Sequence, residues 1–99
     1  MKKINVYLTK SNRKNKKYMV SIKDKRIHFG DFRYSDYTQH KNVKRKELYI
    51  TRHQKRENWD ISGIYTAGFW SYHLLWSHPS LTQAINQLKK KFNINIIIS

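Results

Sequence analysis

The stretch Glu57–Pro79, ENWDISGIYTAGFWSYHLLWSHP, decides the fold of this chain. It contains no Lys or Arg, although the 99-residue chain carries a formal net charge of +15, and it holds all three tryptophans, Trp59, Trp70 and Trp76. Large aromatic side chains bury the most apolar area per residue. We therefore expect this segment to form the core of a small domain with a cationic exterior. A platform for stacking on nucleic-acid bases and an interface with another protein are the alternatives.

Helices are predicted within this stretch and after it. Thr66 is a candidate N-cap for a helix over 67–76, which is apolar nearly all round and so should be buried. Ser80 and Gln83 have the spacing of a capping box that would begin the next helix. The apolar residues of that helix recur with the 3.6-residue period and form a single stripe, made of Leu81, Ala84, Ile85, Leu88 and Phe92.

Before the aromatic stretch, the chain favours one more helix and several strands. Asn42 is a good N-cap for a helix that runs to about Arg56. Residues 4–9 and 94–98 have strand-like patterns, and 18–30 resembles a hairpin with a turn at 23–25. We therefore predict an α+β fold, in which a small antiparallel sheet of hairpin 18–30 plus the terminal strands packs with about three helices. Residues 1–99 are expected to form a single domain, with a basic loop or arm at 10–17.

Composition and motifs argue against several classes of protein. The chain has no cysteine, and no apolar run is long enough to span a bilayer or serve as a signal peptide. We expect a protein that is neither secreted nor bound to a membrane. The histidines share no standard metal-ligand spacing, so neither a metal nor a cofactor is expected. No phosphate loop, nucleophile elbow or carboxylate cluster is present, so we predict no catalytic residues and no enzyme.

Charge is the strongest indication of function. A net charge of +15 makes the folded chain repel itself, and an anionic partner relieves that repulsion. Within 41–56 only Glu47 interrupts the basic residues, and Arg45, Arg52 and Arg56 fall on one face of the predicted helix. Nucleic acid, expected to be duplex DNA, is the leading partner. The predicted nucleic-acid-binding residues lie in the arm and in this helix: Arg13, Lys14, Lys16, Lys17, Lys41, Lys44, Arg45, Arg52, Lys55 and Arg56.

One resemblance covers about residues 18–92. Its elements recur in order: IHFG at 27–30, YSDYT at 34–38, His40-Lys41, Arg45-Lys46, Tyr49, Arg52-His53, TAGFWS at 66–71 and LLW at 74–76. In these elements the chain resembles an uncharacterised family of small basic proteins of large double-stranded DNA viruses, the nucleocytoplasmic large DNA viruses. The resemblance implies a virus-encoded protein located in the virion, the host-cell virus factory or the nucleus. It assigns no catalytic or binding residue.

Together these observations predict a non-enzymatic, sequence-tolerant nucleic-acid-binding protein of a large DNA virus, associated with the genome in the virion. The main alternative is a small structural or cement protein of the capsid whose charge meets an acidic virion protein. A minor alternative is a small nuclease that uses His40 or His53 as a base. The sequence leaves the oligomeric state open.

Overall fold

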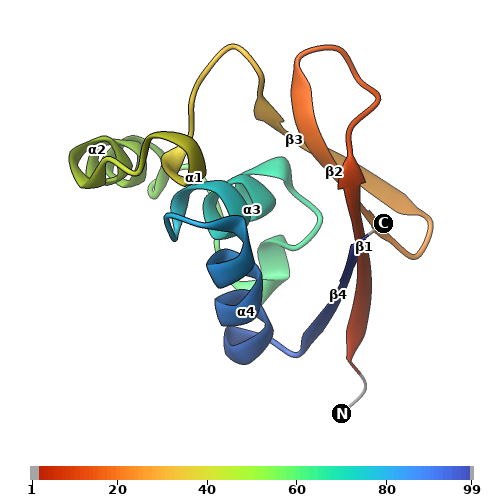
Figure 1. The fold of residues 1–99 in the computed structure, drawn as a ribbon. Helices are drawn as coiled ribbons and strands as arrows, with labels where there is room; N and C mark the ends of the chain where they lie inside the picture. The colour runs from red at the N-terminus through yellow and green to blue at the C-terminus, as the bar shows by residue number, and fades with distance from the viewer. Residues whose placement is uncertain (1–2, 99) are drawn as a thin grey trace.

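A computed structural model describes residues 3–98 and shows a sheet covered on one face by helices (Figure 1). The strands of this part of the chain are β1 (Ile4–Lys10), β2 (Lys16–Ile22), β3 (Lys25–Asp31) and β4 (Ile94–Ile98). All the helical segments lie between β3 and β4 in the sequence. They are α1 (Tyr37–His40), α2 (Val43–His53), η1 (Ile61–Gly63), α3 (Ala67–Trp70), η2 (Ser71–Trp76) and α4 (Leu81–Lys91). The predicted α+β class is confirmed.

The sheet has the order β3-β2-β1-β4 and is mixed. β1 pairs antiparallel with β2, and β2 with β3, so the predicted hairpin is confirmed. β4 pairs with β1 in the parallel sense, from Ile4 opposite Ile94 to Leu8 opposite Ile98, so the predicted antiparallel sheet has one parallel pair at its edge. Parallel neighbours need a long connection. The helical segments supply it by returning the chain to the end of the sheet where β1 begins.

The segment 10–17, predicted as a basic loop or arm, is the connection between two strands together with their ends. β1 extends to Lys10 and β2 begins at Lys16, which leaves only 11–15 as a loop. The Ser11 backbone N–H donates to the Lys17 carbonyl at 3.2 Å, and the Ser11 hydroxyl lies 2.7 Å from His28 Nδ1 on β3. These hydrogen bonds hold the connection against the sheet, so it does not extend from the domain as an arm.

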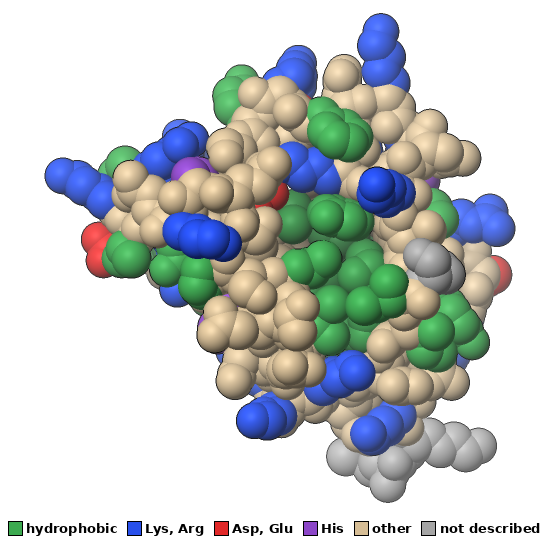
Figure 2. Space-filling view, viewed as in Figure 1, with side chains coloured by type: hydrophobic (Ala, Val, Ile, Leu, Met, Phe, Trp, Pro, Cys, Tyr) green, Lys and Arg blue, Asp and Glu red, His purple; other side chains and the backbone are tan. Residues whose placement is uncertain are grey.

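The core lies between the sheet and the aromatic segment. Phe69 and Trp70 are fully buried, with ring centroids 5.0 Å apart in an edge-to-face arrangement. The indole N–H of Trp70 donates to the Ile64 carbonyl at 2.7 Å, which satisfies its one polar atom. The predicted stripe of α4 also packs inward, and its Ala84, Ile85 and Leu88 are buried. Figure 2 shows hydrophobic side chains gathered in the hollow between helices and sheet, with Lys and Arg around them.

The helix starts agree with the capping patterns. Side-chain oxygens of Asn42, Thr66 and Ser80 each accept from the backbone N–H three residues later, at 3.1, 3.3 and 3.3 Å. Two details differ from the predictions. α2 ends at His53 rather than near Arg56, and the second half of the predicted 67–76 helix is the π-helical segment η2. Ser71, Leu75 and Trp76 of this segment form the floor of a cleft.

Candidate nucleic-acid interface

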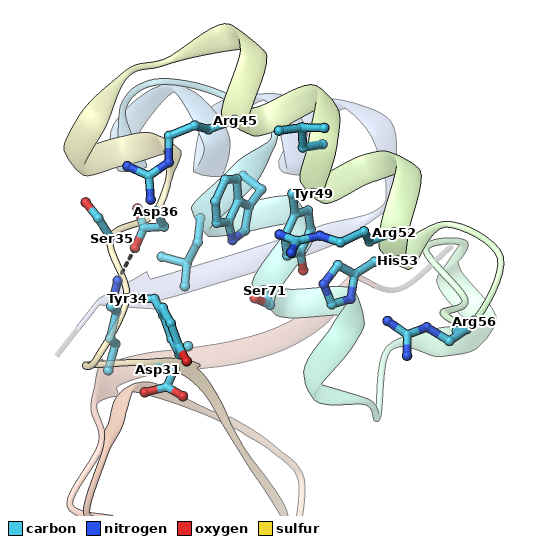
Figure 3. A pocket seen from close by; sticks show the side chains of 15 residues that line it. Asp31, Tyr34, Ser35, Asp36, Arg45, Tyr49, Arg52, His53, Arg56 and Ser71 are labelled. Carbon is cyan, nitrogen blue, oxygen red and sulfur yellow. Dashed lines mark hydrogen bonds and ion pairs between the residues drawn. The ribbon is translucent and has the colours of Figure 1, made fainter.

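A cleft of about 540 Å³ opens between α2 and the connection from β3 to α1, over the floor supplied by η2 (Figure 3). Arg45, Tyr49 and Arg52 extend from α2 on one side. Tyr34, Ser35 and Asp36 lie on the connection opposite. The complete lining is Lys17, Gly30, Asp31, Tyr34, Ser35, Asp36, Arg45, Leu48, Tyr49, Arg52, His53, Arg56, Ser71, Leu75 and Trp76.

Three arginines give this cleft its charge. Arg45, Arg52 and Arg56 all line it, so the shared face predicted from their spacing is confirmed. Within residues 3–98 none of the three forms an ion pair, and all three are exposed. A guanidinium presents several N–H donors in a planar fork that matches phosphate and carboxylate oxygens. The cleft therefore offers three uncompensated cations to an anionic ligand.

The two carboxylates of the cleft do not cancel these arginines, because each already has a cation of its own. Asp31 accepts two side-chain hydrogen bonds from Arg33, at 3.0 Å from Nε and 2.8 Å from Nη2. These bonds, with one from the Arg33 backbone, lower the pKa of Asp31 to about 2. Asp36 is paired with Lys17 at 2.6 Å. Both acids are thus occupied by partners other than the three arginines.

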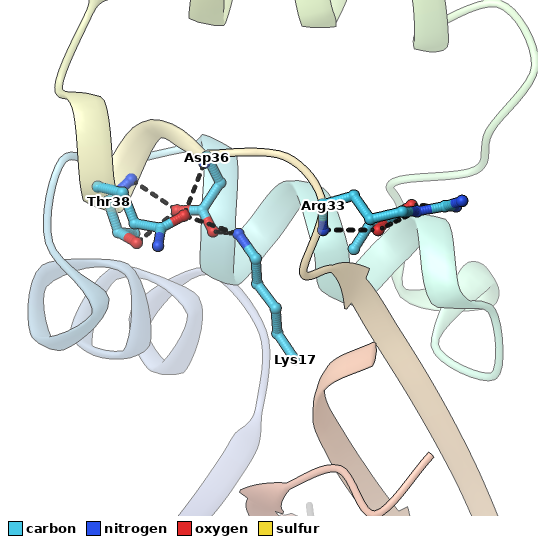
Figure 4. Close-up of polar contacts among 6 residues, drawn as sticks. Lys17, Arg33, Asp36 and Thr38 are labelled. Atoms are coloured by element: carbon cyan, nitrogen blue, oxygen red, sulfur yellow. Dashed lines mark hydrogen bonds and ion pairs between the residues drawn. The ribbon is translucent and has the colours of Figure 1, made fainter. Parts of the chain in front are cut away.

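The Lys17–Asp36 pair is buried and belongs to a hydrogen-bond network (Figure 4). Lys17 Nζ also donates to Gln39 Oε1 at 2.7 Å, and the Asp36 carboxylate caps α1 by accepting from the Thr38 backbone at 2.9 Å. The aliphatic part of the Lys17 side chain passes over Gly30, whose φ is +79°. A Cβ atom added at Gly30 would lie 2.9 Å from a methyl group of Leu75. Lys17, which was predicted to contact nucleic acid, lines the cleft, but Asp36 and Gln39 already occupy its ammonium group.

Aromatic packing holds α2 at a fixed position beside the cleft. The Tyr49 ring stacks on Trp76 with centroids 4.3 Å apart and on His53 at 4.2 Å. Burial raises the pKa of Tyr49 to about 12, so it stays neutral. His53 Nδ1 lies 3.0 Å from the carboxylate of Glu57, which also accepts from the Trp59 indole at 3.0 Å. The arginines of α2 therefore project from a helix that is anchored on its inner side.

Asp31–Tyr34, called here the 31–34 turn, was not foreseen as part of the site. Phe32 and Tyr34 are 66% and 67% exposed, and they flank Arg33. The Tyr34 N–H donates to the Asp31 carbonyl at 3.1 Å, and the Phe32 N–H donates to the Asn15 carbonyl at 3.0 Å. The sequence signal was two aromatic residues beside an arginine in a segment without apolar periodicity. Nothing in that pattern showed that the turn faces α2.

The other predicted residues lie outside the cleft. Lys44 and Lys55 are exposed on and just after α2, and Lys41 donates to the Pro79 carbonyl at 2.7 Å. Arg13 and Lys14 lie in the β1–β2 connection, and Lys16 begins β2. The structure thus brings Arg45, Arg52 and Arg56 together at one cleft and spreads the remaining cations over neighbouring surface.

Two further findings concern the part of the chain that the structure describes. Among residues 3–98 no three His, Asp or Glu side chains are grouped so that they could hold a metal ion. In the same residues no helix is both long and apolar enough to cross a membrane.

Comparison with known proteins gives one partial match. A model described as "Family of unknown function (DUF5754)" matches residues 6–53, just under half of the chain. The matched part runs from β1 to the end of α2. It includes the 31–34 turn, Arg45 and Arg52, and leaves out the aromatic segment that supplies the core and the cleft floor. No curated protein and no solved structure shows significant similarity to the chain.

Proposed function

We propose that this protein binds nucleic acid through the phosphate backbone, without sequence preference and without catalysis. The observation that carries the proposal is the convergence of Arg45, Arg52 and Arg56 on one cleft without acidic partners in residues 3–98. Guanidinium groups that bind phosphates position a nucleic acid but do not distinguish its bases. Such binding releases counterions, and it weakens steeply as salt is added.

A long polyanion fits the charge distribution better than a small anion. The net charge of +15 far exceeds what one cleft could use, and exposed lysines such as Lys44 and Lys55 lie along the same helix or just beyond it. A nucleic acid that fills the cleft would contact these lysines where the strand extends beyond the cleft. An acidic protein would present fewer and less regular charges. The association with a viral genome rests on the resemblance described above for residues 18–92.

The test is a salt titration of binding with a charge-matched control. Gln replaces Arg45, Arg52 and Arg56 in one variant, and Lys25, Lys89 and Lys90, exposed cations outside the cleft, in the other. Both variants have three fewer charges, and Gln keeps helix propensity at the positions that lie in α2 and α4. For each phosphate that a variant no longer neutralises, the slope of log K against log salt should shrink by about 0.9 with duplex DNA and about 0.7 with single strands.

We expect the slope to shrink strongly in the cleft variant and only slightly in the control variant, with both melting as cooperatively as the original protein. Equal reductions in the two variants would show that only overall charge matters and would contradict the assignment of the cleft. If the original protein bound neither single-stranded nor duplex nucleic acid at low salt, the proposal would be wrong. An acidic protein partner would then be favoured.

A further inference from the structure

We propose that the nucleic acid in this cleft is single-stranded, with unpaired bases stacked on Tyr34 and Phe32 of the 31–34 turn. This inference rests on the proposed function and adds the form of nucleic acid that is bound. It differs from the sequence-based expectation of duplex DNA. The residues that carry it are two exposed aromatic side chains of one turn: Tyr34, which lines the arginine-lined cleft, and Phe32, two residues before it.

The exposure of these two rings has no explanation in the packing of the domain. Phe32 and Tyr34 are 66% and 67% exposed, whereas the buried core already contains Phe29, Phe69 and Trp70. A single exposed apolar residue is ordinary on a protein surface. Here two aromatic residues lie within three positions of each other, and Tyr34 itself lines the cleft that the three arginines share. Aromatic rings beside a cationic groove are the features with which proteins bind single strands.

Hydrogen bonds hold the backbone of the 31–34 turn, from which the two rings extend. The Asp31 carboxylate accepts from the Arg33 backbone at 2.9 Å and from its guanidinium, while the Asp31 carbonyl accepts from Tyr34. The hydrogen bond from Phe32 to Asn15 ties the turn to the β1–β2 connection. Because the backbone is already ordered, stacking a base on these rings costs little additional conformational entropy.

The shape of the cleft also favours a single strand. Its volume of about 540 Å³ is that of a site for a ligand of nucleotide size. In a duplex each base is covered on both faces by its neighbours, so its face is not available to Tyr34. In a single strand the base can stack on the 31–34 turn while a flanking phosphate reaches α2, since the two walls face each other across the floor of η2 (Figure 3).

The experiment compares three fluorescently labelled probes of equal length, namely oligo-dT, oligo-rU and a mixed-sequence DNA duplex, by anisotropy at fixed salt. The proteins are the original chain, Phe32→Ala/Tyr34→Ala, the conservative variant Tyr34→Phe, and a matched control, Tyr7→Ala/Tyr65→Ala. Tyr7 and Tyr65 are 48% and 51% exposed and lie outside the cleft lining, so this control removes the same kind of surface ring elsewhere.

We expect the original protein to bind a single strand more tightly than the duplex. For each base that can no longer stack, Phe32→Ala/Tyr34→Ala should weaken single-strand binding by about 5- to 150-fold, the range of alanine substitutions at stacking sites. Duplex affinity and the salt slope should hardly change, because no cation is removed. Tyr34→Phe should retain single-strand binding, and so should the Tyr7/Tyr65 control. The dT and rU probes tell whether the preferred strand is DNA or RNA.

This inference would be wrong if the original protein bound the duplex as tightly as a single strand, or more tightly, and if Phe32→Ala/Tyr34→Ala kept the original single-strand affinity. The proposed function would stand in that case if the salt slope still shrank in the arginine variant. A reduction in the Tyr7/Tyr65 control as large as in the turn variant would also overturn it, because stacking would then not be localised at the turn. If none of the three probes bound the original protein, both the proposed function and this inference would be wrong.

Discussion

Aromatic residues serve two contrasting regions of this molecule. In the core, Phe69 and Trp70 are fully enclosed by the sheet and the helices, and the one polar atom of Trp70 has a partner. On the 31–34 turn, of which Tyr34 lines the cleft, Phe32 and Tyr34 are about two-thirds exposed and the backbone is held by hydrogen bonds. The same class of side chain therefore stabilises the fold in one region and remains available to a ligand in the other. Substitutions should separate these two roles.

The largest effect is expected at Trp70. Trp70→Ala should lower the free energy of unfolding by about 3–5 kcal/mol, because it removes a fully buried indole and leaves a cavity. Urea denaturation followed by circular dichroism measures this change, with Trp70→Phe as the milder comparison. If the variant kept its stability but no longer bound nucleic acid, the Trp70 ring would belong to the binding interface and not to the core.

Lys17 tests whether a cation beside the cleft belongs to the fold or to binding. Lys17→Met should cost about 3 kcal/mol, since it leaves the buried Asp36 carboxylate without its partner. Adding Asp36→Asn removes that unpaired charge, keeps an oxygen to cap α1, and should restore part of the stability. The measurement is the same denaturation curve for the single and double variants. Unchanged stability of Lys17→Met together with weaker binding would support the original assignment of Lys17 to nucleic acid.

A pH effect of intermediate size is expected from the buried region. Burial lowers the pKa of His73, whose Nε2 lies 2.7 Å from the Trp59 carbonyl. The unfolded chain therefore binds more protons than the folded one just below the ordinary histidine pKa of about 6.5, and stability should fall as the pH drops through that value. Melting temperatures from pH 8 to pH 5 test this, and His73→Gln should reduce the slope.

Part of that slope should persist in His73→Gln, because burial also lowers the pKa values of His28, His40 and His78. If the melting temperature of the original protein were flat or rose toward pH 5, the idea that these histidines fold in the neutral form would be wrong.

The smallest effect on stability is expected at the 31–34 turn. Phe32→Ala/Tyr34→Ala should change the free energy of unfolding by no more than about 0.5 kcal/mol per site, as is usual for exposed residues. Denaturation of the variant used in the binding experiment provides the measurement. A destabilisation comparable to that of Trp70→Ala would show that the rings support the fold and would remove the contrast between the two regions.

Local features of the fold were predictable from the sequence, because caps and helical periods are set by neighbouring residues. Asn42, Thr66 and the stripe of α4 were identified in this way. The parallel pairing of β1 with β4 could not be predicted, because it joins segments about 90 positions apart and depends on the path of every helix between them. The π-helical segment η2 was not predicted either, because π-helices are rare and the apolar pattern of 67–76 is that of an ordinary buried helix.

The candidate site was predictable only on the α2 side. The spacing of Arg45, Arg52 and Arg56 indicates one helix face, and these arginines do line the cleft. The opposite wall depends on the placement of the 31–34 turn, which a hydrogen bond from Phe32 to Asn15, 17 residues earlier, ties to the β1–β2 connection. The ion pair of Lys17 could not be predicted, because its partner Asp36 is 19 residues away and no local pattern distinguishes a lysine that forms a buried ion pair from one on the surface.

The parallel pairing of β1 and β4 has a consequence for synthesis of the protein. Translation produces β1, β2 and β3 first, and these strands can pair as soon as they emerge from the ribosome. The other side of β1 stays an open edge, with unpaired backbone donors and acceptors, until residues 94–98 arrive. Such an edge can pair with another chain during that interval. Completion of the sheet therefore waits for almost the whole of the described chain, and it is the pairing of β4 that closes this edge of β1 to other chains.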